Sequence, residues 1–163
     1  MKVKASHKLS LLGSDSIPYQ LIYSSQKLGT PPRNYPASNA VDGNANTLWI
    51  ANSDRYGENV YWGLQFKDAN DNFATRKINK VSVQLEQSDC NRTIEVFAIT
   101  SVKNQKDFEK ISCGKKTLDH GSGEKLEFNV NPVGDYYGIQ VVLLERSGGV
   151  AWPAIAEVEI YGD

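Results

Sequence analysis

Apolar and polar residues alternate with a period of two along much of the chain. The pattern is clear in the segments 62–66, 81–85 and 126–130, where every second residue is apolar. Successive side chains of a β-strand point to opposite faces, so this alternation is typical of strands with one buried face. We therefore predict a strand in each segment.

Two other segments, 94–99 and 138–144, are richer in apolar residues and predict central strands covered on both faces. Clusters of Gly, Pro, Asn, Asp and Ser predict turns between the strands. The main clusters are 29–32, 68–72, 119–123 and 131–135. No window has the i, i+3, i+4, i+7 spacing of a helix. The pattern favours an all-β fold, a β-sandwich or jelly roll of about eight antiparallel strands.

Length and charge narrow the picture further. The chain has 163 residues and shows no internal repeat or linker, which predicts a single domain over residues 1–163. Its net charge is −1 and its basic residues are scattered, which argues against a nucleic-acid partner. No apolar run approaches the roughly 20 residues that span a bilayer. The first eight residues lack the apolar core of a signal peptide, so we expect either a cytoplasmic protein or an extracellular module cut from a larger secreted protein.

A dense group of oxygen-bearing side chains lies between residues 37 and 49. Asp42, Asn44 and Asn46 repeat at every second position, as in a calcium-binding EF-hand loop, and calcium takes about six to eight oxygen ligands. Thr47 stands where that loop needs glycine, and Ser53 where it needs glutamate. A calcium site here would need an acidic ligand from elsewhere in the chain. The alternative is an Asp-Gly turn held by side-chain hydrogen bonds, without metal.

The same run, 37–49, resembles the early motif of discoidin-type domains, also called coagulation-factor C-type or galactose-binding-like domains. The segments 61–66 and 156–162 are similar to later strands of that family, most of all to discoidin-like carbohydrate-binding modules and lectins. The resemblance implies a structural calcium ion held by the first motif and the last strand. Carried over to this chain, its ligands would be Asn39, Asp42, Asn44, Thr47, Ala156 and Glu157.

The resemblance also implies a shallow sugar pocket at one end of the sandwich, built from the loops 52–59, 88–92 and 145–152. Sugars bind through an aromatic platform and a few well-placed polar side chains. We predict that Trp152 is the platform, with Arg92 and Asn91 as the first candidates for pairing with hydroxyls and Arg55, Asp54 and Tyr56 next. The alternatives are that Trp152 packs into the core and that Arg92 caps a strand edge. Trp49 and Trp62 are predicted to be core residues.

Catalysis is not favoured by the sequence. The two histidines, His7 and His120, lie in polar segments, and no nucleophile elbow, phosphate loop or paired-histidine metal motif is present. A glycosidase with two carboxylates remains an alternative, although it would need a deep cleft. We predict a non-catalytic, calcium-stabilised carbohydrate-binding module or lectin domain that recognises galactose-type glycans, either free or as part of a larger multi-domain protein.

Two other binding functions stay open. Adhesion to proteins or cell surfaces leaves no signature in such a sequence. Insertion into phospholipid membranes is less favoured, because the loops offer only Tyr56, Val150 and Trp152 as apolar tips. The two cysteines, Cys90 and Cys113, could form one disulfide or remain free thiols.

Overall fold

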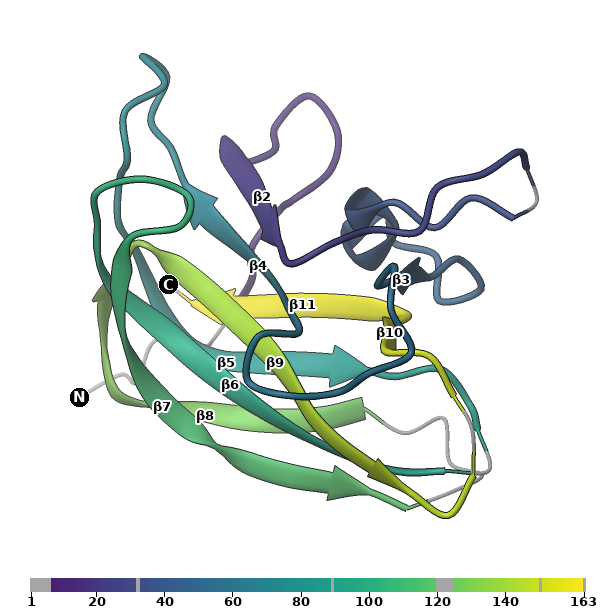
Figure 1. Cartoon of the computed structure of the whole chain (residues 1–163). Helices are drawn as coiled ribbons and strands as arrows, with labels where there is room; N and C mark the ends of the chain where they lie inside the picture. Colours follow the sequence, from purple (N-terminus) through teal and green to yellow (C-terminus); the bar gives the residue numbers. More distant parts are fainter. Residues whose placement is uncertain (1–6, 32, 89, 120–124, 150, 163) are drawn as a thin grey trace.

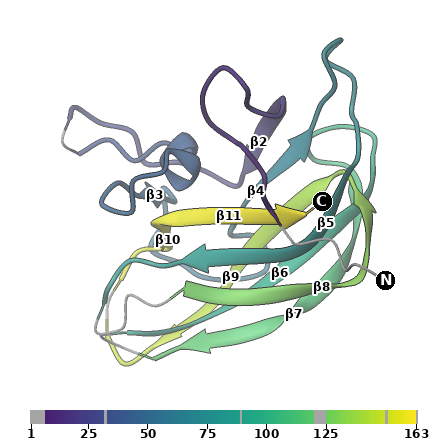
Figure 2. The ribbon, with the colours of Figure 1, turned by 180° about the vertical axis from the view of Figure 1, so that it is seen from behind.

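The computed structural model describes residues 7–31, 33–88, 90–119, 125–149 and 151–162. These residues form two large antiparallel sheets and one short strand pair. The first sheet has the order β1-β11-β5-β8 and the second the order β2-β4-β9-β6-β7, and β3 pairs with β10 (Figures 1 and 2). The elements are β1 (His7–Lys8), β2 (Tyr19–Tyr23), η1 (Ala37–Val41), β3 (Trp49–Ile50), β4 (Tyr61–Phe66), β5 (Arg76–Gln84), β6 (Asn91–Val102), β7 (Phe108–Leu118), β8 (Lys125–Tyr136), β9 (Gly138–Ser147), β10 (Ala154–Ile155) and β11 (Glu157–Gly162).

The structure confirms the predicted β-sandwich. Of the eleven strands found in the described residues, β1, β3 and β10 have only two residues each, which leaves eight longer strands. All five segments expected to be strands are strands, and β9, predicted to be covered on both faces, lies in the middle of the five-stranded sheet.

The core lies between the sheets and contains the alternating apolar residues. Trp62, Leu64 and Phe66 of β4 are fully buried, as are Val81 and Val83 of β5. Trp49 and Trp62 are also at 0% exposure, which confirms both as core residues. Their indole N–H groups donate to the carbonyls of Ser25 (3.0 Å) and Ala37 (2.9 Å). A buried indole nitrogen needs such a partner, and the bond to Ala37 ties η1 to the core.

The prediction of a turn at 131–135 was wrong, because this segment lies inside β8. Its pairing with β5 jumps from Asn129 opposite Lys80 to Gly134 opposite Ile78. Pro132 therefore sits where the ladder needs no donor, and β8 is an edge strand, where proline is tolerated. Strand β7 was not predicted, because its many lysines hide the alternation. It forms the other sheet's edge, where charged residues discourage pairing with another chain.

The two cysteines are free thiols. Cys90 directly precedes β6, whereas Cys113 lies in β7 beside the irregularity at Val96 and Phe97. Six residues of strand separate these positions, about 20 Å at the usual rise, whereas the Cα atoms of a disulfide lie within about 7 Å. Within the part of the chain that the structure describes, there is no helix with the length and hydropathy to cross a membrane.

Candidate functional site

The turn that follows η1 is organised by its own side chains. The Asp42 carboxylate accepts hydrogen bonds from the Asn44 N–H (2.9 Å) and from the Thr47 hydroxyl, and Asn44 Oδ1 accepts one from the Asn46 N–H (2.9 Å). Gly43 has φ +76°, a conformation that glycine adopts without strain. These bonds bring the oxygens of Asp42, Asn44 and Thr47 into one tight loop.

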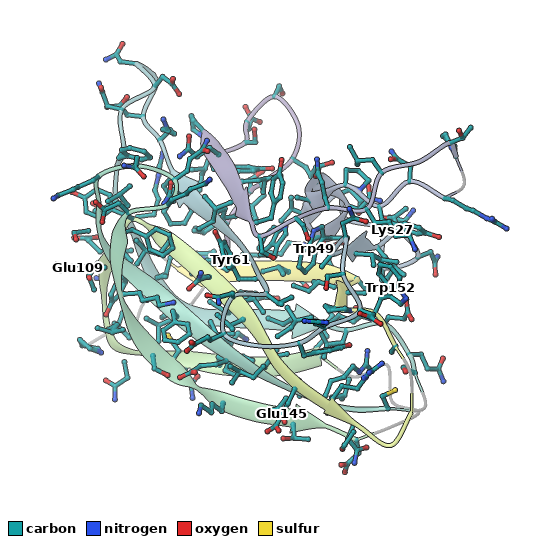
Figure 3. The ribbon with its side chains drawn as sticks, in the orientation of Figure 1. Lys27, Trp49, Tyr61, Glu109, Glu145 and Trp152 are labelled. Atoms are coloured by element: carbon teal, nitrogen blue, oxygen red, sulfur yellow. The ribbon has the colours of Figure 1, made fainter. Side chains whose placement is uncertain are left out.

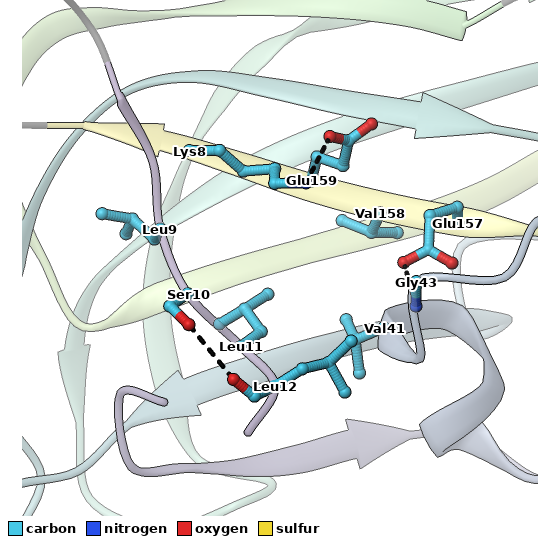
Figure 4. Close-up of a pocket in the computed structure, with 10 residues that line it drawn as sticks. All are labelled: Lys8, Leu9, Ser10, Leu11, Leu12, Val41, Gly43, Glu157, Val158 and Glu159. Carbon is cyan, nitrogen blue, oxygen red and sulfur yellow. Dashed lines mark hydrogen bonds and ion pairs between the residues drawn. The ribbon is translucent and has the colours of Figure 1, made fainter. Parts of the chain in front are cut away.

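Glu157, the first residue of β11, reaches this turn from the other end of the sequence. Its Oε1 accepts a hydrogen bond from the Gly43 N–H at 3.2 Å (Figure 4). Its Oε2 is buried and has no hydrogen-bond partner among the residues that the structure describes. A buried carboxylate oxygen without a partner is costly, and a bound cation would satisfy it.

The raised pKa of Glu157 also indicates that its charged form lacks a close cationic partner among the described residues. Burial raises the pKa of Glu157 to about 7; the Gly43 hydrogen bond opposes this shift, and the nearby charge of Asp42 adds to it. A divalent cation between the two carboxylates would stabilise both charged forms and so offset the rise in the pKa of Glu157. Among the described residues, no three His, Cys, Asp or Glu side chains form a metal cluster. Any cation here would therefore rely on two carboxylates together with amide, hydroxyl and main-chain oxygens, a donor set that suits calcium.

The other two predicted ligands lie beside the turn. The Asn39 side-chain nitrogen donates to the carbonyl of Leu48 at 2.9 Å, which holds the far end of the loop. Ala156 directly precedes Glu157, and its N–H donates to Gln84 O at 2.8 Å. The structure thus brings Asp42, Asn44, Thr47 and Glu157 together, with Asn39 and Ala156 next to them.

The three loops expected to carry a sugar site also meet at one end of the sandwich. Tyr56 donates its hydroxyl hydrogen to the Trp152 carbonyl (3.2 Å), and Gly57 N–H donates to Leu143 O (3.0 Å). Strands β6 and β9 run side by side, with Arg92 opposite Arg146. Asn91, Arg92 and residues 145–147 therefore belong to strands, not to loops as predicted. We call this region, formed by the described residues 54–57, 86–88, 90–92, 144–149, 151 and 152, the loop end.

Trp152 lies outside the strands and is 37% exposed, unlike the two core tryptophans. One face of its ring contacts Lys27, whose Nζ lies 3.7 Å from the ring centroid. Figure 3 shows both side chains on the same side of the molecule, near β10. The indole is thus a surface ring that carries a cation.

Arg92 is buried, with 2% of its surface exposed. Its Nε and Nη2 have no hydrogen-bond partner among the described residues. Burial lowers the pKa of Arg92, while the nearby Tyr56 and Glu86 act in the opposite direction. Burial likewise raises the pKa of the half-buried Glu86, and the charge of Arg92 opposes this. The guanidinium therefore lies under the surface with unused donors.

A pocket of about 440 Å³ opens at the loop end. Its lining consists of Asp54, Arg55, Tyr56, Leu144, Glu145 and Arg146. The Arg146 guanidinium lies 5.6 Å from the centroid of the Tyr56 ring and donates to the Ala151 carbonyl at 3.2 Å. Burial raises the pKa of Tyr56 to about 12, so its hydroxyl stays protonated and can donate. The pocket is shallow and mixes charged groups with one aromatic ring.

Three residues of the loop end or its border were not singled out from the sequence. Glu86 follows the alternating segment 81–85, and Arg146 lies in a segment that was expected to be a loop. Both are polar residues in or beside the loops 88–92 and 145–152 that were expected to carry the sugar site, a signal that could have found them. Lys27 carries no such signal, because its approach to Trp152 depends on tertiary structure.

Comparisons with solved structures show that other proteins share this fold. The structure is similar to a family 32 carbohydrate-binding module of Clostridium perfringens NanJ in complex with galactose (16% identity, TM-score 0.65, 96% of this chain and 99% of that chain). It is also similar to the C-terminal domain of a chitobiase from Bacteroides fragilis (18% identity, TM-score 0.64, 96% and 98%). A third similar structure is chitosan-binding module 1 of a chitosanase/glucanase from Paenibacillus sp. IK-5 (14% identity, TM-score 0.57, 90% and 95%).

At these identities the solved structures establish a shared fold and no more. No curated protein matches the sequence. The family model of the F5/8 type C domain, the discoidin domain, matches residues 22–158. This range is most of the chain and includes the turn after η1 (residues 42–47, called the acidic turn below), the loop end and Glu157. The chain therefore belongs to the F5/8 type C domain family.

Proposed function

We propose that this domain is a carbohydrate-binding module and that the loop end holds the glycan. The observation that carries the proposal is Arg92, a buried guanidinium with two nitrogens lacking partners among the described residues. Both nitrogens lie beneath the surface, and Arg92 does not line the pocket. A sugar hydroxyl could use these donors when the side chains that cover Arg92 move aside, and hydrogen bonds from a charged donor are strong. Tyr56 and Trp152, joined by a hydrogen bond, supply aromatic surface at the same end.

The shape of the loop end supports weak, selective binding. The pocket is open and polar, so a sugar would keep part of its hydration, and we expect a dissociation constant near the millimolar range, about −4 kcal/mol. Trp152 would contribute stacking area, and Arg92 with Asn91 would pair with hydroxyls. Asp54, Arg55 and Tyr56, which share the pocket, would contact the outer part of the glycan.

A galactose-type ligand is the finer part of the proposal. Its support is the fold shared with a module whose structure contains galactose. Other similar folds are described as chitosan-binding, so the fold itself does not choose the sugar. The similar structures include parts of larger enzymes, which supports the proposal that this domain is a module attached to a larger, extracellular protein.

We further propose that a structural calcium ion is held by Asp42, Asn44, Thr47 and Glu157, with Asn39 and Ala156 beside them. The unpartnered, buried Oε2 of Glu157 supports this assignment. The ion would neutralise two carboxylates and join the η1 turn to β11. The ion would lie outside the proposed glycan site and would stabilise the fold, without a catalytic role.

We propose a binding role without catalysis, because the loop end is shallow and its groups suit recognition. Membrane insertion is not favoured by the exposed apolar side chains. In the described residues, these are Leu12, Tyr23, Leu28, Val133 and Trp152, and of them Trp152 alone belongs to the loop end. A wedge into lipid normally needs a larger apolar patch.

A glycan array probed with the labelled domain tests the proposal. We expect binding to a limited group of glycans with galactose-type ends, and no binding by the Trp152→Ala variant at equal concentration. Because single-site affinity is low, the domain should be displayed as a tetramer to gain avidity. An array that the multivalent domain leaves empty would contradict the proposed function.

A further inference from the structure

The fold brings Lys27 to Trp152 from a distant part of the sequence. The Lys27 N–H donates to the Ile50 carbonyl (2.8 Å), and Ile50 pairs with Ala154 in β10. Ala154 lies two residues beyond Trp152, so the main chain places Lys27 beside the segment that carries the indole. The side chain then spans the remaining gap and sets Nζ 3.7 Å from the ring centroid.

Lys27 differs from the other lysines that lie over aromatic rings. Four others do so in the described residues, namely Lys67, Lys80, Lys110 and Lys116. Each of these four also contacts an oxygen: Asp71 for Lys67, Glu127 for Lys80, the Gln140 side chain for Lys110 and the Glu127 carbonyl for Lys116. Lys27 has no such oxygen partner within the described parts of the chain.

The acidic side chains that the structure describes at the loop end do not change this picture. Asp54 and Glu145 line the pocket with Arg55 and Arg146, and Glu86 interacts with Arg92. The ammonium of Lys27 is therefore a cation at the edge of the loop end that rests on an exposed ring. A cation on a ring at an exposed site is weakly held, and the lysine stem is flexible.

This arrangement has opposite consequences for neutral and for acidic sugars. A pyranose that stacks on this face of Trp152 must move the ammonium away from the ring. A neutral sugar has no charged group that could bind the displaced ammonium. A sugar with a carboxylate offers it an ion pair and charge-assisted hydrogen bonds.

We propose that Lys27 makes the loop end selective for glycans in which the stacked pyranose carries a carboxylate, as in a uronic acid. The inference rests on the proposed function, because it takes Trp152 as the stacking platform. It adds a ligand class and a residue to that site. Lys27 binds the carboxylate, while Arg92 binds ring hydroxyls.

Calorimetric titration with matched sugars tests the inference. Galactose and galacturonic acid differ only at C6, and glucose with glucuronic acid provides a second pair. We expect the wild-type domain to bind the acid of a pair roughly fivefold tighter than the neutral sugar, since an exposed ion pair contributes up to about that factor. This preference should shrink at high salt.

The Lys27→Gln variant should lose the preference in a characteristic way. Its affinity for the acid should fall, whereas its affinity for the neutral sugar should stay the same or rise, because the ring face is uncovered. The control is Lys67→Gln, which removes a lysine that also lies over a ring, 4.3 Å from the Phe73 centroid. Lys67 follows the end of β4 that pairs with Gly138 at the start of β9, whereas the loop end lies at the other end of β9. That control should keep the wild-type preference.

Two results would overturn the inference while leaving the proposed function intact. One is a wild-type domain that binds neutral sugars as tightly as the acids. The other is a Lys27→Gln variant in which both affinities fall together, which would make Lys27 a support for the ring and not a carboxylate partner. If the wild-type domain bound no member of either pair and no glycan on the array, the proposed function would fail and the inference with it.

Discussion

The three tryptophans show how similar residues take different roles in this fold. Trp49 and Trp62 are at 0% exposure and donate their indole hydrogens to main-chain carbonyls. Trp152 is 37% exposed and carries Lys27 on its ring. The sequence allowed this division to be predicted, because Trp62 stands in an alternating strand, whereas Trp152 follows a glycine pair and precedes a proline.

Trp152→Ala should therefore leave the fold intact. The variant loses a surface ring and a contact with Lys27 worth roughly 1 kcal/mol or less, so its free energy of unfolding should fall by no more than about that amount. Trp62→Ala, the matched core variant, should lose about 3–5 kcal/mol because it leaves a cavity. Urea denaturation followed by circular dichroism compares the two. Equal losses would mean that Trp152 is a structural residue.

Arg92 shows where prediction from the sequence stops. Its residue type and its place in the loop 88–92, which the family resemblance assigns to the sugar pocket, made it a candidate for hydroxyl pairing, but its burial could not be predicted. That burial depends on tertiary structure, which pairs β6 with β9 and brings Arg92 near Tyr56 from a distant part of the sequence. Lys27 escaped notice for the same reason, since only the tertiary structure brings it to Trp152.

At the level of elements, the strands with clear alternation could be predicted and the irregular ones could not. Strands β4, β5, β6 and β9 each bury one or both faces in the sandwich, so the burial appears in their sequences. The end of β8 escapes this rule because its residues 130–133 have no partner in β5. A stretch without ladder bonds accepts Pro and Gly, and its sequence then looks like a turn.

The close pairing of β9 with β4 leads to a prediction for Gly138, which pairs with Gln65. A Cβ atom at Gly138 would lie 1.9 Å from the main-chain oxygen of Leu64, and neither backbone can move without breaking the sheet. Gly138→Ala should lower the free energy of unfolding by about 3 kcal/mol. The control is Gly134→Ala, where the nearest atom would be a ring carbon of Tyr136 at 3.9 Å. Thermal unfolding of both variants measures the difference in stability. A Gly138→Ala variant as stable as the control would contradict the close contact between Gly138 and the main chain of Leu64.

At the level of the whole molecule, the acidic turn and β11 join positions 43 and 157 through one hydrogen bond. A cation at this point would link segments separated by most of the chain and so hold the fold closed. The sequence predicted most of these residues through the family resemblance. The unpartnered oxygen of Glu157 became visible only in the structure.

Removal of calcium should lower the melting temperature, because an ion that binds only the folded state stabilises it. At a calcium concentration 100 times its dissociation constant, the loss on chelation would be about 2.7 kcal/mol. Asp42→Asn should remove the response to chelator and calcium. Asp68→Asn is the control, since Asp68 also accepts hydrogen bonds from the main chain of a turn but lies away from Glu157. Identical melting curves with chelator and with added calcium would contradict the assignment.

The central claim is that the loop end binds glycans through the unused donors of Arg92. It is tested most directly by calorimetric titration of the wild-type domain and of Arg92→Met with a glycan that the array identifies. The Met side chain fills similar space without donors, so the variant should stay folded and lose at least about tenfold in affinity, as stranded hydroxyls cost roughly 1–3 kcal/mol. A folded Arg92→Met domain that binds this glycan as tightly as the wild type would contradict the claim.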